Sequence, residues 1–282
     1  SVREMRRMTA DVRGKEYVEK DATPTQIGET IIKVSDLSVT YDGKPALKSV
    51  SATIASNEIV AIMGRNGAGK SSLLKSLAGT SQLATGFVDV SGFNPRNLKG
   101  KERRSTIGFI PQEPSDLLYG QSVQNECDQA DKDNQIPSGT TAQILNQLVP
   151  GISGTTHPRD LSEGQRLGLA LSIVLSSNPA VLVLDEPTRG LDYQAKKELT
   201  KILIEFARAT GKCVVLATHD VELVAELATR VMFLADGDIV ADGSTLDVLL
   251  SSPAFAPQVA KVMSPQPWLS VKDVVAAIKE MP

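Results

Sequence analysis

The sequence contains no long hydrophobic run. Its longest apolar stretches, such as Ile59–Met63, Ala180–Leu184, Cys213–Ala217 and Val231–Ala235, are five residues long. A membrane-spanning helix needs about 20 predominantly apolar residues in succession. The sequence also has no signal-peptide pattern of basic start, apolar core and small-residue cleavage site. We therefore expect this chain neither to cross a membrane nor to carry a signal peptide.

Cysteines and excess charge are scarce as well. The two cysteines, Cys127 and Cys213, are too few for a disulfide framework and suit a reducing cytosol. The formal net charge is −3, which gives no support to a basic nucleic-acid binder. The rest of the composition is ordinary, because 41% of the 282 residues are hydrophobic and 22% are charged. These values exclude a largely disordered chain and suit one or two globular domains.

The hydrophobic pattern predicts an α/β fold. Strand-like runs are expected at 31–41, 47–54, 58–63, 86–90, 106–110, 181–184, 212–217, 231–234 and 239–241. Helical periodicity is expected at 71–78, 142–148, 163–175, 191–209, 221–228 and 271–278. Strands that alternate with helices imply a mostly parallel sheet.

Three segments depart from this alternation. Residues 1–30 mix basic and acidic side chains with few large apolar ones, so we interpret them as a charged, partly helical leader or linker. Residues 113–160 are polar, and we expect a small helical insertion there. Residues 251–282 contain several prolines and form a predicted C-terminal helical extension. The first residue is Ser1 rather than Met, which fits an excised second half of a longer protein or a cloning remnant equally well.

A phosphate-binding motif occupies residues 64–71. The sequence Gly-Arg-Asn-Gly-Ala-Gly-Lys-Ser fits G-x-x-x-x-G-K-[ST], follows an apolar strand and opens a helix. Glycines allow backbone N–H groups to turn inward around a polyphosphate, and the helix start adds positive partial charge. Lys70 supplies a full charge for the β- and γ-phosphates, and the Ser71 hydroxyl can bind Mg²⁺. The alternative is a simple glycine-rich turn before a helix.

Two carboxylates, Asp185 and Glu186, follow the apolar strand 181–184. Ligands bind at the carboxyl ends of strands in open α/β sheets. Asp185 is therefore expected to hold Mg²⁺, and Glu186 is expected to polarise the water that attacks the γ-phosphate. The alternative is an acidic N-cap for the helix that follows.

The strongest family signal lies at residues 161–165. The sequence Leu-Ser-Glu-Gly-Gln begins 24 residues before Asp185 and resembles the signature of ABC transporter nucleotide-binding domains. The resemblance covers about residues 31–250 and implies a P-loop NTPase (RecA-like) core with a mostly parallel sheet. It also implies an N-terminal antiparallel β subdomain and an inserted α-helical subdomain at about 113–175. Glu163 replaces the commoner glycine, a variation that we regard as tolerated because Ser162 and Gly164 remain.

The resemblance assigns roles to individual residues. It implies that Tyr41 stacks on adenine, that Gln112 senses Mg²⁺, and that His219 meets the γ-phosphate. The residues expected to bind ATP are Tyr41, Asn66, Gly67, Ala68, Gly69, Lys70, Ser71, Ser72, Gln112, Ser162, Gly164 and Gln165. Those expected at Mg²⁺ are Ser71, Gln112 and Asp185, and those expected to be catalytic are Glu186, His219 and Lys70.

Three of these assignments have purely structural alternatives. Ser162 and Gln165 also fit a capping box at a helix start. Tyr41 also fits a half-buried strand aromatic, and His219 fits a neutral histidine at a strand end.

Residues 112–120, Gln-Glu-Pro-Ser-Asp-Leu-Leu-Tyr-Gly, and the tail after residue 250 resemble energy-coupling factor importers. These ABC proteins take up vitamins and transition-metal ions. The resemblance implies an ATPase that dimerises with itself or with a related ATPase domain and works with separate transmembrane subunits. It implies a peripheral position on the cytoplasmic face of the membrane. An apolar groove around Leu117, Leu118 and Tyr119 is a candidate docking site for those subunits.

Two other classes of protein compete with this interpretation. One is a soluble, non-transport ABC ATPase that acts on ribosomes or DNA, although the sequence has no long coiled-coil heptad run. The other is a P-loop kinase outside the ABC family, which the 161–165 signature and His219 disfavour. We expect no nucleic-acid partner.

Overall fold

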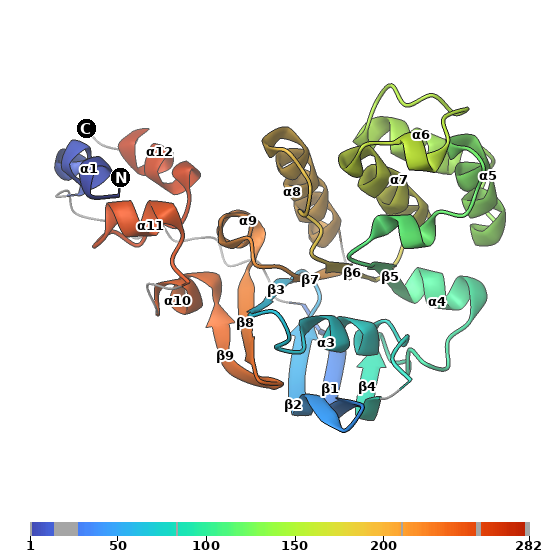
Figure 1. The fold of residues 1–282 in the computed structure, drawn as a ribbon, viewed down its shortest axis with the longest axis horizontal. Coiled ribbons are helices and arrows are strands. Elements are labelled where there is room, and N and C mark those ends of the chain that lie inside the picture. Colours follow the sequence, from blue (N-terminus) through green and yellow to red (C-terminus); the bar gives the residue numbers. More distant parts are fainter. Residues whose placement is uncertain (1, 14–27, 83, 210, 252–254, 280–282) are drawn as a thin grey trace.

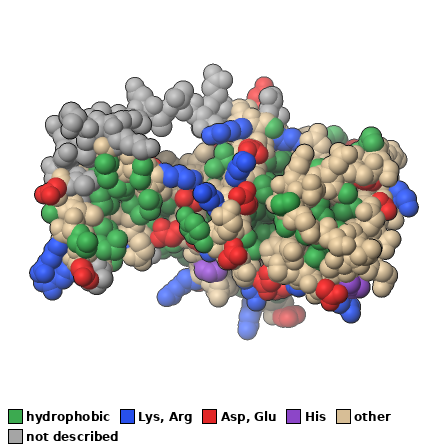
Figure 2. Space-filling view, turned by 90° about the horizontal axis from the view of Figure 1, so that it is seen from above, with side chains coloured by type: hydrophobic (Ala, Val, Ile, Leu, Met, Phe, Trp, Pro, Cys, Tyr) green, Lys and Arg blue, Asp and Glu red, His purple; other side chains and the backbone are tan. Residues whose placement is uncertain are grey.

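The computed structural model describes residues 2–13, 28–82, 84–209, 211–251 and 255–279 of the chain. Within these ranges, no helix combines the length and the apolarity that a membrane span requires. Both cysteines are buried and free. Acidic and basic side chains are interspersed on the face shown in Figure 2.

The larger of two sheets has six strands in the order β5-β6-β7-β3-β8-β9. These strands are β3 (Ile59–Gly64), β5 (Ile107–Ile110), β6 (Val181–Asp185), β7 (Cys213–Ala217), β8 (Arg230–Ala235) and β9 (Asp238–Ser244). Neighbouring strands are parallel except β8 and β9, which are antiparallel. The predicted mostly parallel sheet is confirmed, and the carboxyl ends of β3, β6 and β7 meet at one edge of it.

The smaller sheet is antiparallel and has the order β2-β1-β4. It consists of β1 (Thr30–Tyr41), β2 (Lys44–Ala55) and β4 (Ala84–Val90). Asp42 and Gly43 connect β1 to β2 with φ angles of 47° and 75°. Two positive φ angles match the two-residue hairpin turn that an Asp-Gly pair favours. This sheet is the predicted N-terminal antiparallel β layer.

Helix α3 (Lys70–Leu77) lies between the two sheets, in contact with strands of both (Figure 1). The opposite face of the larger sheet is covered by α7 (Glu163–Ser176), α8 (Tyr193–Arg208), α9 (Val221–Leu227) and α10 (Thr245–Leu250). Val60 and Ile62 of β3 pack on the α3 side, whereas Ala61 and Met63 pack on the α7–α9 side. The strand is buried on both faces, as its continuous apolar run predicts.

A helical cluster is formed by α7 together with the helices that precede it in the chain. It contains η1 (Pro114–Leu117), α5 (Val123–Asn134), α6 (Thr140–Leu148) and η2 (Pro158–Asp160), and α4 (Gly100–Thr106) leads into β5. The predicted helix at 142–148 is confirmed as α6. Helix α5 was not predicted from the pattern, because most of its residues are polar. Its apolar residues Val123, Cys127 and Ala130 recur at helical spacing and are buried.

Helices from the two ends of the described residues lie side by side. Helix α1 (Val2–Met8), which is followed by α2 (Ala10–Arg13), packs against α11 (Gln258–Met263) (Figure 1). The predicted tail helix is α12 (Val271–Lys279), and Trp268 is buried beside α11. Predictions for 14–27, 252–254 and 280–282 fall outside the described residues. The domain boundaries proposed at 1–30, 31–250 and 251–282 stay predictions.

Candidate active site

The phosphate loop joins the end of β3 to the start of α3. Gly69 has a φ of 106°, and a Cβ added there would lie 2.3 Å from the Ala46 carbonyl oxygen. Gly67 has a φ of 84°, and a Cβ added there would meet nothing within 4 Å. A backbone of this shape directs N–H groups into a concave nest at a helix N-terminus, which is an anion-binding arrangement. Position 69 therefore requires glycine for two reasons: its φ is positive, and β2 lies too close to leave room for a side chain.

Lys70 is buried at the first position of α3. Its Nζ donates hydrogen bonds to the carbonyl oxygens of Gly64 at 2.9 Å and Arg65 at 3.3 Å. Both acceptors are neutral, so they hold the ammonium group over the loop without cancelling its charge. This position suits an anion bound in the nest, as the sequence predicts for Lys70.

Asp185 ends β6 and is only 3% exposed. Its Oδ1 is buried and has no hydrogen-bond partner. Burial raises the pKa of the Asp185 carboxyl, although a hydrogen bond from the Ser71 side chain opposes the shift. An unpartnered buried carboxylate oxygen is costly unless a cation or donor satisfies it. Asp185 and Ser71 thus supply two oxygen ligands suited to Mg²⁺, which binds proteins through one or two carboxylates and through substrate phosphates.

Glu186 and His219 are brought together from the ends of β6 and β7. The His219 Nδ1 lies 2.8 Å from Glu186 Oε2, and the His219 backbone N–H donates to the same oxygen at 3.4 Å. The Glu186 side chain is 11% exposed and the His219 side chain is 74% exposed. Glu186 also has a φ of 49°, an uncommon value for a residue with a side chain. Strained backbone of this kind often marks a functional site.

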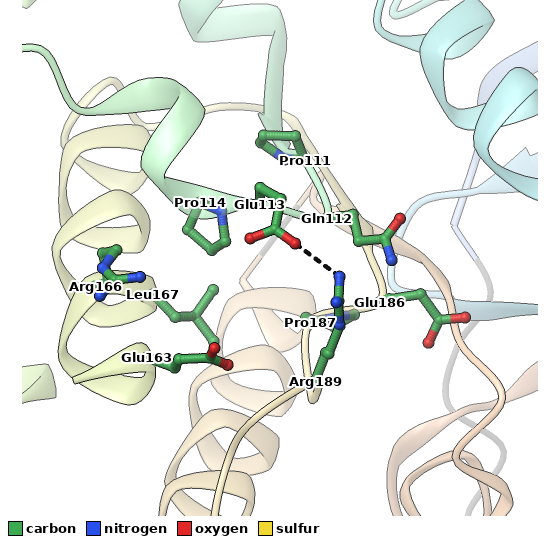
Figure 3. Close-up of a pocket in the computed structure, with 10 residues that line it drawn as sticks. All are labelled: Pro111, Gln112, Glu113, Pro114, Glu163, Arg166, Leu167, Glu186, Pro187 and Arg189. Carbon is green, nitrogen blue, oxygen red and sulfur yellow. Dashed lines mark hydrogen bonds and ion pairs between the residues drawn. The ribbon is translucent and has the colours of Figure 1, made fainter. Parts of the chain in front are cut away.

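Gln112 and Glu186 share a small pocket (Figure 3). Its volume is about 30 Å³, which is enough to admit water. Glu113 and Arg189 form an ion pair of 2.7 Å beside it. The sequence assigned no individual role to either residue, although Glu113 belongs to the stretch 112–120.

Ser162, Gly164 and Gln165 line a different pocket, of about 410 Å³, between α7 and α8. Ser162 Oγ accepts from the Gln165 backbone N–H at 3.3 Å, and Gln165 Oε1 accepts from the Ser162 N–H at 3.0 Å. The structural alternative of a capping box is therefore confirmed. Among the described residues, no hydrogen bond or ion pair joins this segment to the phosphate loop. The role of the segment toward ATP stays a prediction.

Tyr41 is exposed at the end of β1 and pairs with Lys44 across the hairpin. Ala46, two residues further along β2, is the residue that Gly69 approaches. The hairpin end therefore lies beside the phosphate loop. Stacking of Tyr41 on adenine stays a prediction.

The predicted groove around residues 117–119 is only partly apolar, because Leu117 and Leu118 are half-buried. Leu117 packs into the core beside α7, and Leu118 packs on the helical cluster of α5 and α6. Only Tyr119 is fully exposed. The neighbouring pocket of about 560 Å³ has mixed polarity, with lining residues Ser115, Asp116, Leu118, Tyr119, Gly120, Gln121, His157, Pro158, Arg159 and Arg166.

Comparison with known proteins gives consistent matches. The family profile described as ABC transporter matches residues 47–189. A putative ABC transporter ATP-binding protein of Streptomyces coelicolor is 50% identical over 246 residues, which cover 87% of this chain and 44% of that protein. An energy-coupling factor transporter ATP-binding protein, EcfA, of Methanothermobacter thermautotrophicus is 32% identical over 77% of this chain and 72% of its own length. The chain thus spans less than half the length of the Streptomyces relative.

Solved structures agree with the fold. CbiO1 from Clostridium perfringens, described as part of the ABC transporter complex cbiONQ, superposes with a TM-score of 0.67 at 28% identity. That match covers 82% of this chain and 95% of CbiO1. The ATP-binding cassette MJ0796, bound to ADP and phosphate as a dimer, has a TM-score of 0.69 at 24% identity and covers 76% of this chain and 99% of its own.

Proposed function

This chain belongs to the ABC transporter family and is one of its ATPase domains, and from that premise we propose that it powers an importer of the energy-coupling factor type. The observation that carries the ATPase assignment is the 2.8 Å contact between Glu186 and His219, at the same sheet edge as Lys70 and Asp185. The importer type rests on the similarity to EcfA along most of both chains.

ATP binding follows from the phosphate loop. Backbone N–H groups of residues 66–72 and the Lys70 ammonium group hold the β- and γ-phosphates, and Tyr41 supports the adenine ring. Ser71 and Asp185, with Gln112, are the residues that would hold Mg²⁺, which when bound would offset the negative charge of the phosphates. The unpartnered oxygen of Asp185 supports this assignment.

Hydrolysis then depends on Glu186. Its carboxylate accepts a proton from water while the water oxygen forms a bond to the γ-phosphorus and the bond to the ADP oxygen breaks. His219 keeps the carboxylate oriented toward that water through the contact at Oε2. Positioned general bases of this kind contribute about 10²–10⁴-fold to a rate.

Dimerisation follows from the separation of the two half-sites. Ser162, Gly164 and Gln165 of a second ATPase domain complete the site by binding the γ-phosphate from the other side. Hydrogen bonds to a charged group contribute about 1.5–3 kcal/mol each, so several of them favour the closed dimer. ADP lacks the bridging phosphate, and a ligand shifts an equilibrium only through such a difference in affinity. The second domain comes from a copy of this chain or from a related one.

Opening and closing of the dimer drives separate transmembrane subunits, with the ATPase on the cytoplasmic face of the membrane. A vitamin or a metal ion is the class of solute that this importer type carries. The mixed-polarity pocket beside Tyr119 is a docking site for a cytoplasmic segment of those subunits.

The test is affinity purification of the tagged full-length protein from detergent-solubilised membranes. We expect a multi-spanning membrane protein to copurify, and we expect Glu186→Gln protein with Mg²⁺ and ATP to elute as a dimer. Lys70→Ala is the matched control, because it should remain monomeric under the same conditions. Association with ribosome or DNA fractions, and no membrane protein, contradicts the importer proposal.

A further inference from the structure

An ion pair joins Lys196 to Asp220, the residue that follows His219 in the chain. Lys196 Nζ lies 2.6 Å from Asp220 Oδ2, and the two side chains are 38% and 16% exposed. Lys196 comes from the first turns of α8, and Asp220 is the residue that follows His219. The sequence assigned no role to either residue, although Asp220 adjoins the motif histidine.

Asp220 holds its own segment of chain in three ways. Its Oδ1 accepts from the Leu223 N–H at 3.1 Å and caps α9. Its backbone N–H donates to Thr218 Oγ1 at 3.0 Å, and Oδ2 accepts from Lys196. Burial raises the pKa of the Asp220 carboxyl, but the bonds from Lys196 and Leu223 outweigh it, and the net pKa lies below its ordinary value. The carboxylate is therefore charged at neutral pH.

Lys196 is tied in turn to the loop that follows Glu186. Asp192 caps α8 through a bond of 2.8 Å from the Ala195 N–H, and its carbonyl accepts from the Lys196 N–H at 3.1 Å. The loop 187–192 connects Glu186 to this cap. Glu186 and His219 are thus connected in two ways. Their side chains contact each other directly, and a second path runs from Glu186 along the loop to Lys196, and from Lys196 through the ion pair to Asp220 beside His219.

We propose that Lys196 is a positioning residue for ATP hydrolysis, which through its ion pair with Asp220 holds His219 against Glu186. This inference rests on the proposed ATPase function. Lys196 does not belong to the phosphate loop, so its loss affects kcat and leaves the KM for ATP unchanged. Its action requires His219, because the ion pair reaches the catalytic pair through Asp220, the chain neighbour of His219.

The first test compares three variants of the full chain on the same helix. Lys196→Met removes the charge, Lys196→Arg keeps it, and Lys201→Met removes an exposed charge that pairs with Glu205 at 4.0 Å. We expect kcat of Lys196→Met to fall about two- to thirtyfold, the range for residues coupled within one network. Lys196→Arg should recover most of that loss, and Lys201→Met should match the wild type.

The second test separates positioning from a general loss of structure. Asp220→Asn keeps the α9 cap, because asparagine caps as well as aspartate, but removes the charge. It should lower kcat like Lys196→Met, and the double variant should be no worse than either single one. In a His219→Ala background, Lys196→Met should have no further effect on kcat. An equal loss of kcat with and without His219 overturns the proposal.

A third readout does not depend on activity. The chain has only two histidines, His157 and His219, so imidazole ¹⁵N resonances are simple to assign. We expect Lys196→Met to shift the His219 resonances and to leave those of His157 unchanged. An inactive wild-type chain that still shows this shift contradicts the proposed ATPase function and supports the contact path. If the chain is active and Lys196→Met changes neither kcat nor the His219 resonances, the positioning role is overturned.

Discussion

His219 and Glu186 approach each other from two adjacent parallel strands, with Nδ1 2.8 Å from Oε2. The carboxylate is nearly buried while the imidazole is mostly exposed. The histidine therefore faces solvent and contacts one oxygen of a carboxylate that is otherwise sheltered.

Loss of the imidazole should leave ATP binding intact and slow hydrolysis. We expect His219→Ala to lower kcat about 2- to 150-fold, because contacting groups in one network couple by about 0.5–3 kcal/mol. Fluorescent ATP-analogue binding and a phosphate-release assay measure the two effects separately. His157→Ala, a substitution outside the site, is the control. A His219→Ala protein with wild-type kcat contradicts the role assigned to the contact.

The buried Asp185 carboxylate should cost stability in the absence of a cation. Burial raises its pKa, so the folded state disfavours the charged form, and one of its oxygens has no partner. Asp185→Asn should stabilise the nucleotide-free protein by roughly 1 kcal/mol of unfolding free energy, which raises the thermal unfolding midpoint by about 2–4 °C. The same variant should lose Mg²⁺-dependent hydrolysis. Calorimetry and an ATPase assay measure the two changes.

The exposed Asp116, changed to asparagine, is the comparison for Asp185. It should alter neither the midpoint nor the activity. A lower midpoint for Asp185→Asn would show that the carboxylate is stabilising and that the metal-site interpretation is mistaken.

The close approach of Gly69 to β2 predicts a specific steric effect. Gly69→Ala would place a methyl group 2.3 Å from the Ala46 carbonyl oxygen at a φ of 106°. Gly43→Ala imposes only the positive φ of 75°, in open space. Strain at such a φ costs about 1–3 kcal/mol, so Gly69→Ala should be the more destabilising of the two and should abolish ATP binding. Urea unfolding measures the stability of both variants. Equal losses of stability in the two would contradict a steric clash at Gly69.

The Asp220 carboxyl predicts a pH dependence of stability. Its pKa is lowered in the folded state, so its contribution is present above the unfolded pKa of about 3.9 and is lost as the pH falls through the lower folded value. The wild type should exceed Asp220→Asn in stability at neutral pH, and the difference should shrink below about pH 4. Urea midpoints across that range measure it. A difference that is constant with pH contradicts the assigned pKa shift.

Much of the site could be predicted from the chain because its chemistry is local. The phosphate loop is one continuous segment in which glycine, lysine and serine act through backbone N–H groups and the start of α3. Asp185 and Glu186 follow an apolar strand, so a parallel sheet must bring them to the same edge as the loop. The alternation of Val60 and Ile62 with Ala61 and Met63 likewise determines the two buried faces of β3.

The remaining features depend on contacts between distant segments. Lys196 and Asp220 are 24 residues apart, and each has an ordinary local role on a helix surface or at a helix cap. Helix α5 is mostly polar and depends on a few buried side chains such as Cys127. Leu117 and Leu118 were expected at a groove, and tertiary packing leaves both of them half-buried against the core and the helical cluster. Periodicity carries no information on such pairings.

Glu186 is assigned as the general base of an ATPase, and the other proposals for this chain depend on that role. The decisive comparison is between the ATP turnover rates of Glu186→Gln and of Glu205→Gln, an exposed carboxylate on α8. We expect unchanged ATP affinity for both variants, and a turnover rate at least about 100-fold below the wild type for Glu186→Gln only. A Glu186→Gln protein that hydrolyses ATP at the wild-type rate would contradict the assignment.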